Sequence, residues 1–140
     1  MNKDKEMDFN GQVKGTFDTL QVNGDIALSG QLIHPVDGDH IFSSNTFNFD
    51  CNLSMTQHVD AQGMTGDGTI TFSNEVEGTT YVLVFTQGSG NHNISFPSGW
   101  WLNDTAFDFT TLGDNGRAVI TAMYIDGEFI YSVKNLLYVA

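Results

Sequence analysis

The sequence is poor in basic residues and in cysteine, and each shortage excludes a kind of protein. Five Lys and Arg residues stand against 17 Asp and Glu residues, which gives a net charge of −12. Nucleic-acid binding needs a basic surface that neutralises phosphates, so neither nucleic acid nor an anionic membrane surface is expected as a partner. Cys51 is the single cysteine, so no disulfide can form within the chain, and the histidines lack zinc-ligand spacing.

Long apolar runs and helical periodicity are missing as well. No run approaches the roughly 20 apolar residues of a membrane-spanning helix, so membrane insertion is not expected. No segment of ten residues repeats with the helical period. The first 12 residues contain no apolar core, so we expect no signal peptide and folding in a cytoplasm. The 140 residues are enough for one domain with a real core.

What the sequence has instead is short stretches that alternate between apolar and polar residues. The most informative is 81–85, whose residues are almost all β-branched or aromatic. Because side chains alternate along a strand, Tyr81, Leu83 and Phe85 face one way, and Val82 and Val84 face the other. Both faces are apolar, so we expect a second sheet to cover one and a neighbouring chain to cover the other.

Turn residues at 87–91 predict a reversal into a half-buried return strand at 94–96, which Pro97 ends. The residues from 54 to 68 are rich in glycine and are expected to form a loop. The dipeptide Asp126-Gly127 predicts a tight hairpin. Further strands are expected at residues 46–53 (with Phe47, Phe49, Cys51 and Leu53 on one buried face), 69–72, 106–109, 118–125, 129–133 and 136–139. This pattern predicts an all-β fold, an antiparallel β-sandwich of the jelly-roll type.

We expect two parts: an N-terminal arm with a short β stem over residues 1–33, and the sandwich head over 34–140. Residues 1–15 read either as a frayed tail or as an arm that orders on a partner. In 16–33 short apolar pairs alternate with Asn-Gly and Ser-Gly, typical of very short strands. Copies packed around a symmetry axis would stabilise such strands, although an ordinary hairpin fits too. The apolar residues of segment 16–33 include Leu20, Val22, Ile26 and Leu28.

The sequence offers little catalytic chemistry. Asp37, Asp39 and His40 could bind a cation, but the spacing of a calcium loop is absent, so we interpret them as a solvated turn. No nucleophile elbow or phosphate loop is present, and we expect no enzyme, cofactor or metal, although the many carboxylates leave glycan cleavage open. Trp100 and Trp101 should face opposite ways. One belongs in the core, and the other fits a subunit interface or a sugar contact that includes His92.

In the second half of the chain, the segments GTTYVLVFTQ, NISFPSGWWLND and AVITAMYIDGEFIYSV follow one another, and LQVNGDIALSGQLI precedes them. The order of these segments resembles that of a C-terminal domain of bacteriophage tail-fibre and virion-surface proteins, and LQVNGDIALSGQLI is similar to the stem before that domain. The matching residues are Gly78, Tyr81, Leu83, Gln87, Phe96, Pro97, Ser98, Gly99, Trp100, Asp126, Gly127 and Tyr131.

The resemblance implies a homotrimer on the outer surface of a virion, synthesised in the host cytoplasm and attached to a major capsid or tail protein. The short stem favours a capsid decoration (cement) or spike protein. The alternative is a tail-fibre or tail-tip head that binds a host-surface glycan through Trp100, Trp101 and His92. The expected trimer interface consists of Leu20, Val22, Ile26, Leu28, Val82, Val84, Val119 and Met123.

Overall fold

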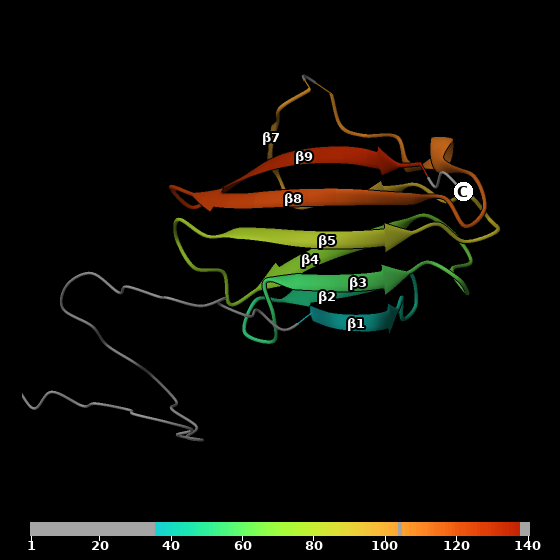
Figure 1. The fold of residues 1–140 in the computed structure, drawn as a ribbon, viewed down its shortest axis with the longest axis horizontal. Helices are drawn as coiled ribbons and strands as arrows, with labels where there is room; N and C mark the ends of the chain where they lie inside the picture. The colour runs from blue at the N-terminus through green and yellow to red at the C-terminus, as the bar shows by residue number, and fades with distance from the viewer. Residues whose placement is uncertain (1–35, 104, 138–140) are drawn as a thin grey trace, which may run out of the picture. The chain divides into compact units, whose positions relative to one another are not determined.

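The computed structural model describes residues 36–103 and 105–137, and in them the protein is all-β, as predicted (Figure 1). The arm and stem expected in residues 1–33 lie outside these residues. The strands are β1 (Val36–Ile41), β2 (Thr46–Asp50), β3 (Thr56–Asp60), β4 (Gly68–Ser73), β5 (Thr80–Thr86), β6 (Ile94–Ser95), β7 (Gly99–Trp101), β8 (Arg117–Ile125) and β9 (Glu128–Leu136). A short 3-10 helix, η1, covers Phe109–Leu112. The strands form a six-stranded sheet, β1-β3-β5-β8-β9-β7, and a three-stranded sheet, β2-β4-β6.

The first six strands alternate between the two sheets in a solenoid-like winding. After each strand the chain crosses to the other sheet, so that β3 lies beside β1, β4 beside β2, and so on. Strands β1, β3 and β5 are therefore parallel to one another, as are β2, β4 and β6. The antiparallel jelly-roll arrangement predicted from the sequence is therefore wrong for this half. Side-chain alternation is the same in parallel and antiparallel strands, so the pattern that revealed the strands carried no information about their direction.

The C-terminal half contains the antiparallel part. Strands β8 and β9 form the predicted hairpin, and Asp126 (φ 54°) and Gly127 (φ 75°) occupy its two-residue turn. Positive φ at both positions matches the twist of the flanking strands. Strand β8 also pairs antiparallel with β5, which joins the hairpin to the solenoid-like half. Strand β7 runs parallel to β9 at the edge of the sheet.

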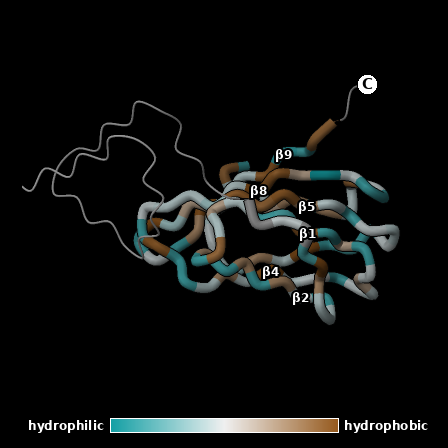
Figure 2. Tube along the Cα trace, turned by 60° about the horizontal axis from the view of Figure 1, so that its bottom comes forward, coloured by the Kyte–Doolittle hydropathy of each residue, from teal (hydrophilic) through white to brown (hydrophobic). Residues whose placement is uncertain are grey.

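The core lies between the two sheets and is mainly aromatic. Tyr81, Leu83 and Phe85 point into it from β5, and Phe47 and Phe49 point into it from β2. The rings of Phe49 and Tyr81 lie 5.7 Å apart and meet edge to face, a favourable geometry for aromatic pairs. In Figure 2, hydrophobic segments lie along β4, β5 and β8, and hydrophilic ones lie in many of the connecting turns.

Three predictions in the first half are wrong. Asp37, Asp39 and His40, interpreted as a solvated turn, belong to strand β1. Residues 54–68 are not all loop, because β3 occupies Thr56–Asp60. Its inward face carries Gln57, a buried amide that donates to the carbonyl oxygens of Asp50 (2.7 Å) and Ser54 (3.1 Å), so the apolar alternation is broken. The predicted strand 46–53 ends at Asp50, and Leu53, expected in the core, is 58% exposed in the turn that follows.

Three further predicted strands differ from the structure. The return strand after the 87–91 turn is only Ile94–Ser95, and it pairs with β4 instead of β5. Residues 106–109 form no strand. The Asp108 carboxylate accepts a hydrogen bond from the backbone N–H of Thr110 (3.0 Å) and caps η1, a local bond that competes with sheet pairing. The expected closing strand at 136–139 is the end of β9, which stops at Leu136; residues 138 and 139 are not described.

Candidate functional site

The candidate site is the face of the six-stranded sheet that points away from the core. Alternate residues of β5, β8 and β9 point to this side, and the strand register brings them together in rows. Val84 lies opposite Val119, and Met123 lies opposite Ile130. No described element packs over this side of the sheet (Figure 1). The outer face, as named here, consists of Thr56, His58, Val82, Val84, Val119, Thr121, Met123, Ile130 and Ser132.

The structure brings the described part of the predicted interface together on this outer face. Val82, Val84 and Val119 are half-buried by their neighbours in the sheet, and Met123 is 38% exposed. The other predicted interface residues, Leu20, Val22, Ile26 and Leu28, lie outside the described residues. Sequence reasoning missed the five residues that complete the face: Thr56, His58, Thr121, Ile130 and Ser132. Apolar and polar residues alternate along 128–136, and this alternation could have placed Ile130 and Ser132 on the side opposite Phe129, Tyr131 and Val133.

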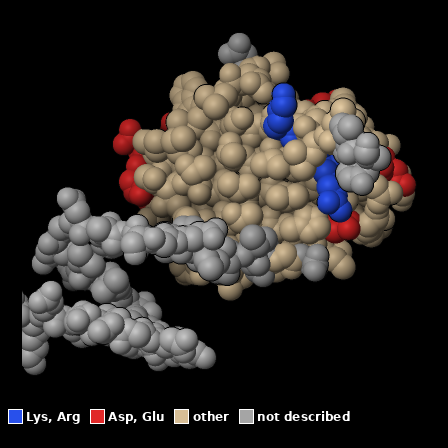
Figure 3. Space-filling model, in the orientation of Figure 1, with Lys and Arg blue, Asp and Glu red and all other residues tan. Residues whose placement is uncertain are grey.

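The outer face is free of acidic side chains, although the chain carries 17 of them. Asp60 at the end of β3 and Glu128 at the start of β9 lie at opposite ends of the sheet, outside the named face, and Asp60 shares a row with Thr86, Arg117 and Leu136. Figure 3 shows a broad uncharged surface over the sheet, with acidic residues at its margins. Such a surface is unusual for a chain of net charge −12 and marks a region that can approach another molecule without repulsion.

The cations of the described region are Arg117 and Lys134, and both lie at one end of this sheet. Lys134 pairs with Val119, and Arg117 pairs with Leu136. On this side of the sheet the two pairs are neighbouring rows, because the pair between them, Ala118 and Asn135, belongs to the alternate set. No hydrogen bond or ion pair links either side chain to another described residue. Both are exposed. We call these two residues the basic end.

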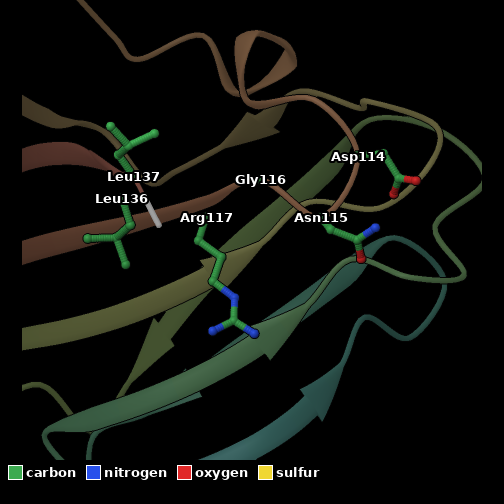
Figure 4. Close-up of a pocket in the computed structure, with 6 residues that line it drawn as sticks. All are labelled: Asp114, Asn115, Gly116, Arg117, Leu136 and Leu137. Carbon is green, nitrogen blue, oxygen red and sulfur yellow. The ribbon is translucent and has the colours of Figure 1, made fainter. Parts of the chain in front are cut away.

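A depression of about 680 Å³ lies beside the basic end. Asp114, Asn115, Gly116, Arg117, Leu136 and Leu137 line it. Figure 4 shows the Arg117 guanidinium pointing away from the Asp114 carboxylate and over the neighbouring strands. The depression therefore combines an available cation with two exposed leucines, a combination that suits contact with an acidic, partly apolar surface.

The other end of the sheet carries Trp100. Its neighbour Trp101 packs against Tyr131 (ring centres 5.0 Å apart) and Phe96 (5.9 Å), whereas Trp100 is 65% exposed. The indole N–H of Trp100 donates to the Glu128 carboxylate at 2.6 Å, which holds the ring in place. Trp100 also lies opposite Ile130 and so borders the outer face.

The structure does not bring His92 to the tryptophans in the way the glycan hypothesis expects. Trp100 shares a row with Ile130, Met123 and Thr80, at the beginning of β5. His92 follows the opposite end of that strand. Seven residues of β5 span roughly 20 Å, too far for one sugar ring to touch both side chains.

The described residues provide neither a metal site nor a reactive thiol. No group of three or more His, Cys, Asp or Glu residues in ranges 36–103 and 105–137 is placed to hold a metal ion. The His40 ring packs against Phe47 instead, with ring centres 5.4 Å apart. Burial raises the pKa of the Cys51 thiol to about 11, so the thiol stays protonated at neutral pH and is a poor nucleophile.

The residues that carry the phage resemblance have structural roles here. The Tyr81 hydroxyl accepts a hydrogen bond from the backbone N–H of Val76 (2.8 Å), and the Tyr131 hydroxyl donates to the carbonyl oxygen of Pro97 (3.1 Å). Gly99 lets β7 approach β9 closely, since a Cβ there would lie 2.5 Å from the carbonyl oxygen of Phe129. Tyr81, Tyr131 and Gly99 thus hold the fold together, and Gly99 also lines, with Ser98, Trp100 and Gly127, a depression beside Trp100.

No family model, curated protein or solved structure matches the chain. Among the described residues, no helix has the length and apolar character needed to cross a bilayer.

Proposed function

We propose that the protein is a structural component of a bacteriophage virion: a homotrimeric surface protein that acts as a short capsid decoration, cement or spike protein. Its work is to bury apolar surface between copies and against a major capsid or tail protein. The proposal assigns it no catalytic residue. The order of motifs from Gly78 to Tyr131 supports the phage origin, because it resembles that of tail-fibre C-terminal domains.

The observation that carries the assembly role is the acid-free outer face. Fully burying a valine or methionine side chain contributes about 1.5–3 kcal/mol relative to exposure. Val82, Val84, Val119 and Met123 are already half covered, so completing their burial supplies a few kcal/mol, and Ile130 adds to this. Negative charges repel one another when two copies approach, so a face without carboxylates is the surface at which two copies can meet at least cost.

Sedimentation velocity at micromolar concentration tests the assembly. We expect a particle of about three times 15.4 kDa. Val84→Glu combined with Val119→Glu places two charges on the outer face and should give monomers. Thr46→Glu is the matched control, because Thr46 is exposed on the three-stranded sheet and its replacement should leave the trimer intact. A wild-type monomer at this concentration would contradict the assembly role.

Electron microscopy of virions that carry a labelled copy tests the location. Label on the capsid shell supports a decoration or cement protein, and label at the tail supports a tail component. Purified virions without label would refute the virion assignment.

A second function, recognition of a host-surface glycan by a receptor-binding head, is favoured by Trp100. An exposed indole ring offers an apolar platform for a sugar ring, and the adjoining Glu128 carboxylate can accept hydroxyl hydrogen bonds. A depression of about 410 Å³, lined by Ser98, Gly99, Trp100, Gly127 and Glu128, accompanies the pair. If Trp100→Ala abolishes binding on a glycan array and leaves assembly unchanged, glycan recognition is favoured over the purely structural role.

A further inference from the structure

The two ends of the β8–β9 hairpin carry opposite charges. Arg117 and Lys134 form the basic end defined above. At the turn, Glu77, Asp126 and Glu128 are all exposed, and Glu77 is held there by accepting a hydrogen bond from the backbone N–H of Asp126 (2.5 Å). We call these three residues together with Trp100 the acidic end.

The two ends cannot neutralise each other within one chain. Glu128 and Lys134 are on the same side of β9 and six residues apart, a separation of roughly 20 Å along the strand. Arg117 and Lys134, in contrast, are diagonal neighbours on β8 and β9, roughly 7–8 Å apart, and repel each other. In the row that contains Arg117, Asp60 is separated from Arg117 by Thr86 of β5, and no ion pair joins the two, so both exposed cations are available to an anionic partner from outside the chain.

We propose that the occupant of the outer face is a second copy of this chain, docked so that the basic end of one copy meets the acidic end of the next. This inference rests on the proposed homo-oligomer and specifies its contact. Lys134 or Arg117 of one copy would pair with Asp126 and Glu128 of its neighbour and lie against the face of Trp100, where a cation and an indole ring attract each other. The uncharged rows of the outer face would lie between the two ends.

The contact has a consequence for symmetry. Two copies packed face to face with antiparallel strands would match both ends at once in an isologous pair, whereas the proposed trimer needs the heterologous form, in which the basic end of each copy meets the acidic end of the next. A heterologous contact forms a closed ring if the rotation between copies closes, and three copies make the smallest such ring beyond a pair. Opposite charges at the two ends also select the relative direction of the strands, because the reverse orientation would place like charges together.

Charge reversal in one chain and its repair in the same chain test the proposal. Arg117→Glu with Lys134→Glu, or Asp126→Lys with Glu128→Lys, should each weaken self-association by about a hundredfold or more, measured by sedimentation. The chain that carries all four substitutions should recover association to within about tenfold of the wild type, because the ends are complementary again. Trp100→Ala should weaken association severalfold. Thr46→Lys is the control for added charge, and circular dichroism checks that each variant is folded.

The outcomes separate this inference from the function on which it depends. If Val84→Glu with Val119→Glu dissociates the protein but the charge reversals leave association unchanged, the outer face is still the interface and the pairing of its ends is refuted. Failure of the four-substitution chain to recover, while it remains folded, also overturns the pairing. If Trp100→Ala removes glycan binding and does not change association, Trp100 belongs to a receptor site and not to this contact. A wild-type monomer would defeat both proposals.

Discussion

Gln87 is the buried polar residue whose replacement should affect the fold most. Its side chain is 0% exposed at the end of β5. Its amide N–H groups donate to the carbonyl oxygens of His92 (2.9 Å) and Phe109 (2.9 Å), and its backbone N–H donates to the carbonyl oxygen of Gly116 (2.8 Å). One residue thus connects the loop after β5, the 3-10 helix and the turn before β8.

Gln87→Leu keeps the volume of the side chain and removes both donors. The carbonyl oxygen of Phe109 is then left buried without its partner, and that of His92 partly so. Each unsatisfied buried group costs about 1–3 kcal/mol, with the lower figure for a group that water can reach. We expect the free energy of unfolding to fall by about 2–4 kcal/mol, a large share of the roughly 5–15 kcal/mol of an ordinary domain.

Urea unfolding followed by circular dichroism measures this loss. The midpoint should fall while the slope of the free energy against urea stays constant, because the surface exposed on unfolding is nearly unchanged. Gln62→Leu is the matched control: Gln62 is exposed, and its replacement should change stability by less than about 0.5 kcal/mol. If Gln87→Leu costs no more than the control, the two carbonyl groups are solvated and Gln87 does not hold these segments together.

Three other perturbations test separate features. The Cys51 thiol, whose pKa burial raises to about 11, should react with iodoacetamide at pH 8 far more slowly in the folded protein than in urea, as mass spectrometry would show; equal rates would contradict its burial. Burial also raises the pKa of Tyr131, so the folded state keeps a proton that the unfolded state loses above about pH 10, and the free energy of unfolding should decrease as pH rises through that point. Tyr131→Phe should reduce this alkaline loss in a urea titration, and an unchanged pH dependence would assign the loss to other groups. Gly99→Ala would place a Cβ 2.5 Å from the Phe129 carbonyl oxygen and should lower stability by about 2 kcal/mol or more with a change in tryptophan fluorescence. Gly66→Ala, whose Cβ would lie 3.5 Å from the Asn45 side chain, should be tolerated.

Much of the secondary structure could be predicted from local patterns. The alternation in 81–85 identified β5 and its inward residues correctly, and Asp126-Gly127 identified the hairpin. Strand β3 could not be found this way, because Gln57 occupies a core position that the pattern requires to be apolar. Its burial depends on two carbonyl oxygens that only the folded chain brings to it.

The candidate site also has residues that the sequence predicted and contacts that it did not. The sequence identified Val82, Val84, Val119 and Met123 as residues that a single sheet cannot cover on both sides. It did not indicate that Trp100 would be tied to Glu128, 28 residues further along, or that His92 would lie at the far end of β5.

The sequence alone determined the strands that alternate clearly, such as β5 and the β8–β9 hairpin, and which of their side chains share a face, because both follow from the two-residue repeat of a single strand. Only the tertiary structure decided that the early strands run parallel, and that the cations of the described region gather at one end of a sheet whose outer face lacks acidic residues. Those features depend on which strands pair, and pairing is set by the burial of side chains distant in the chain, which no local pattern encodes.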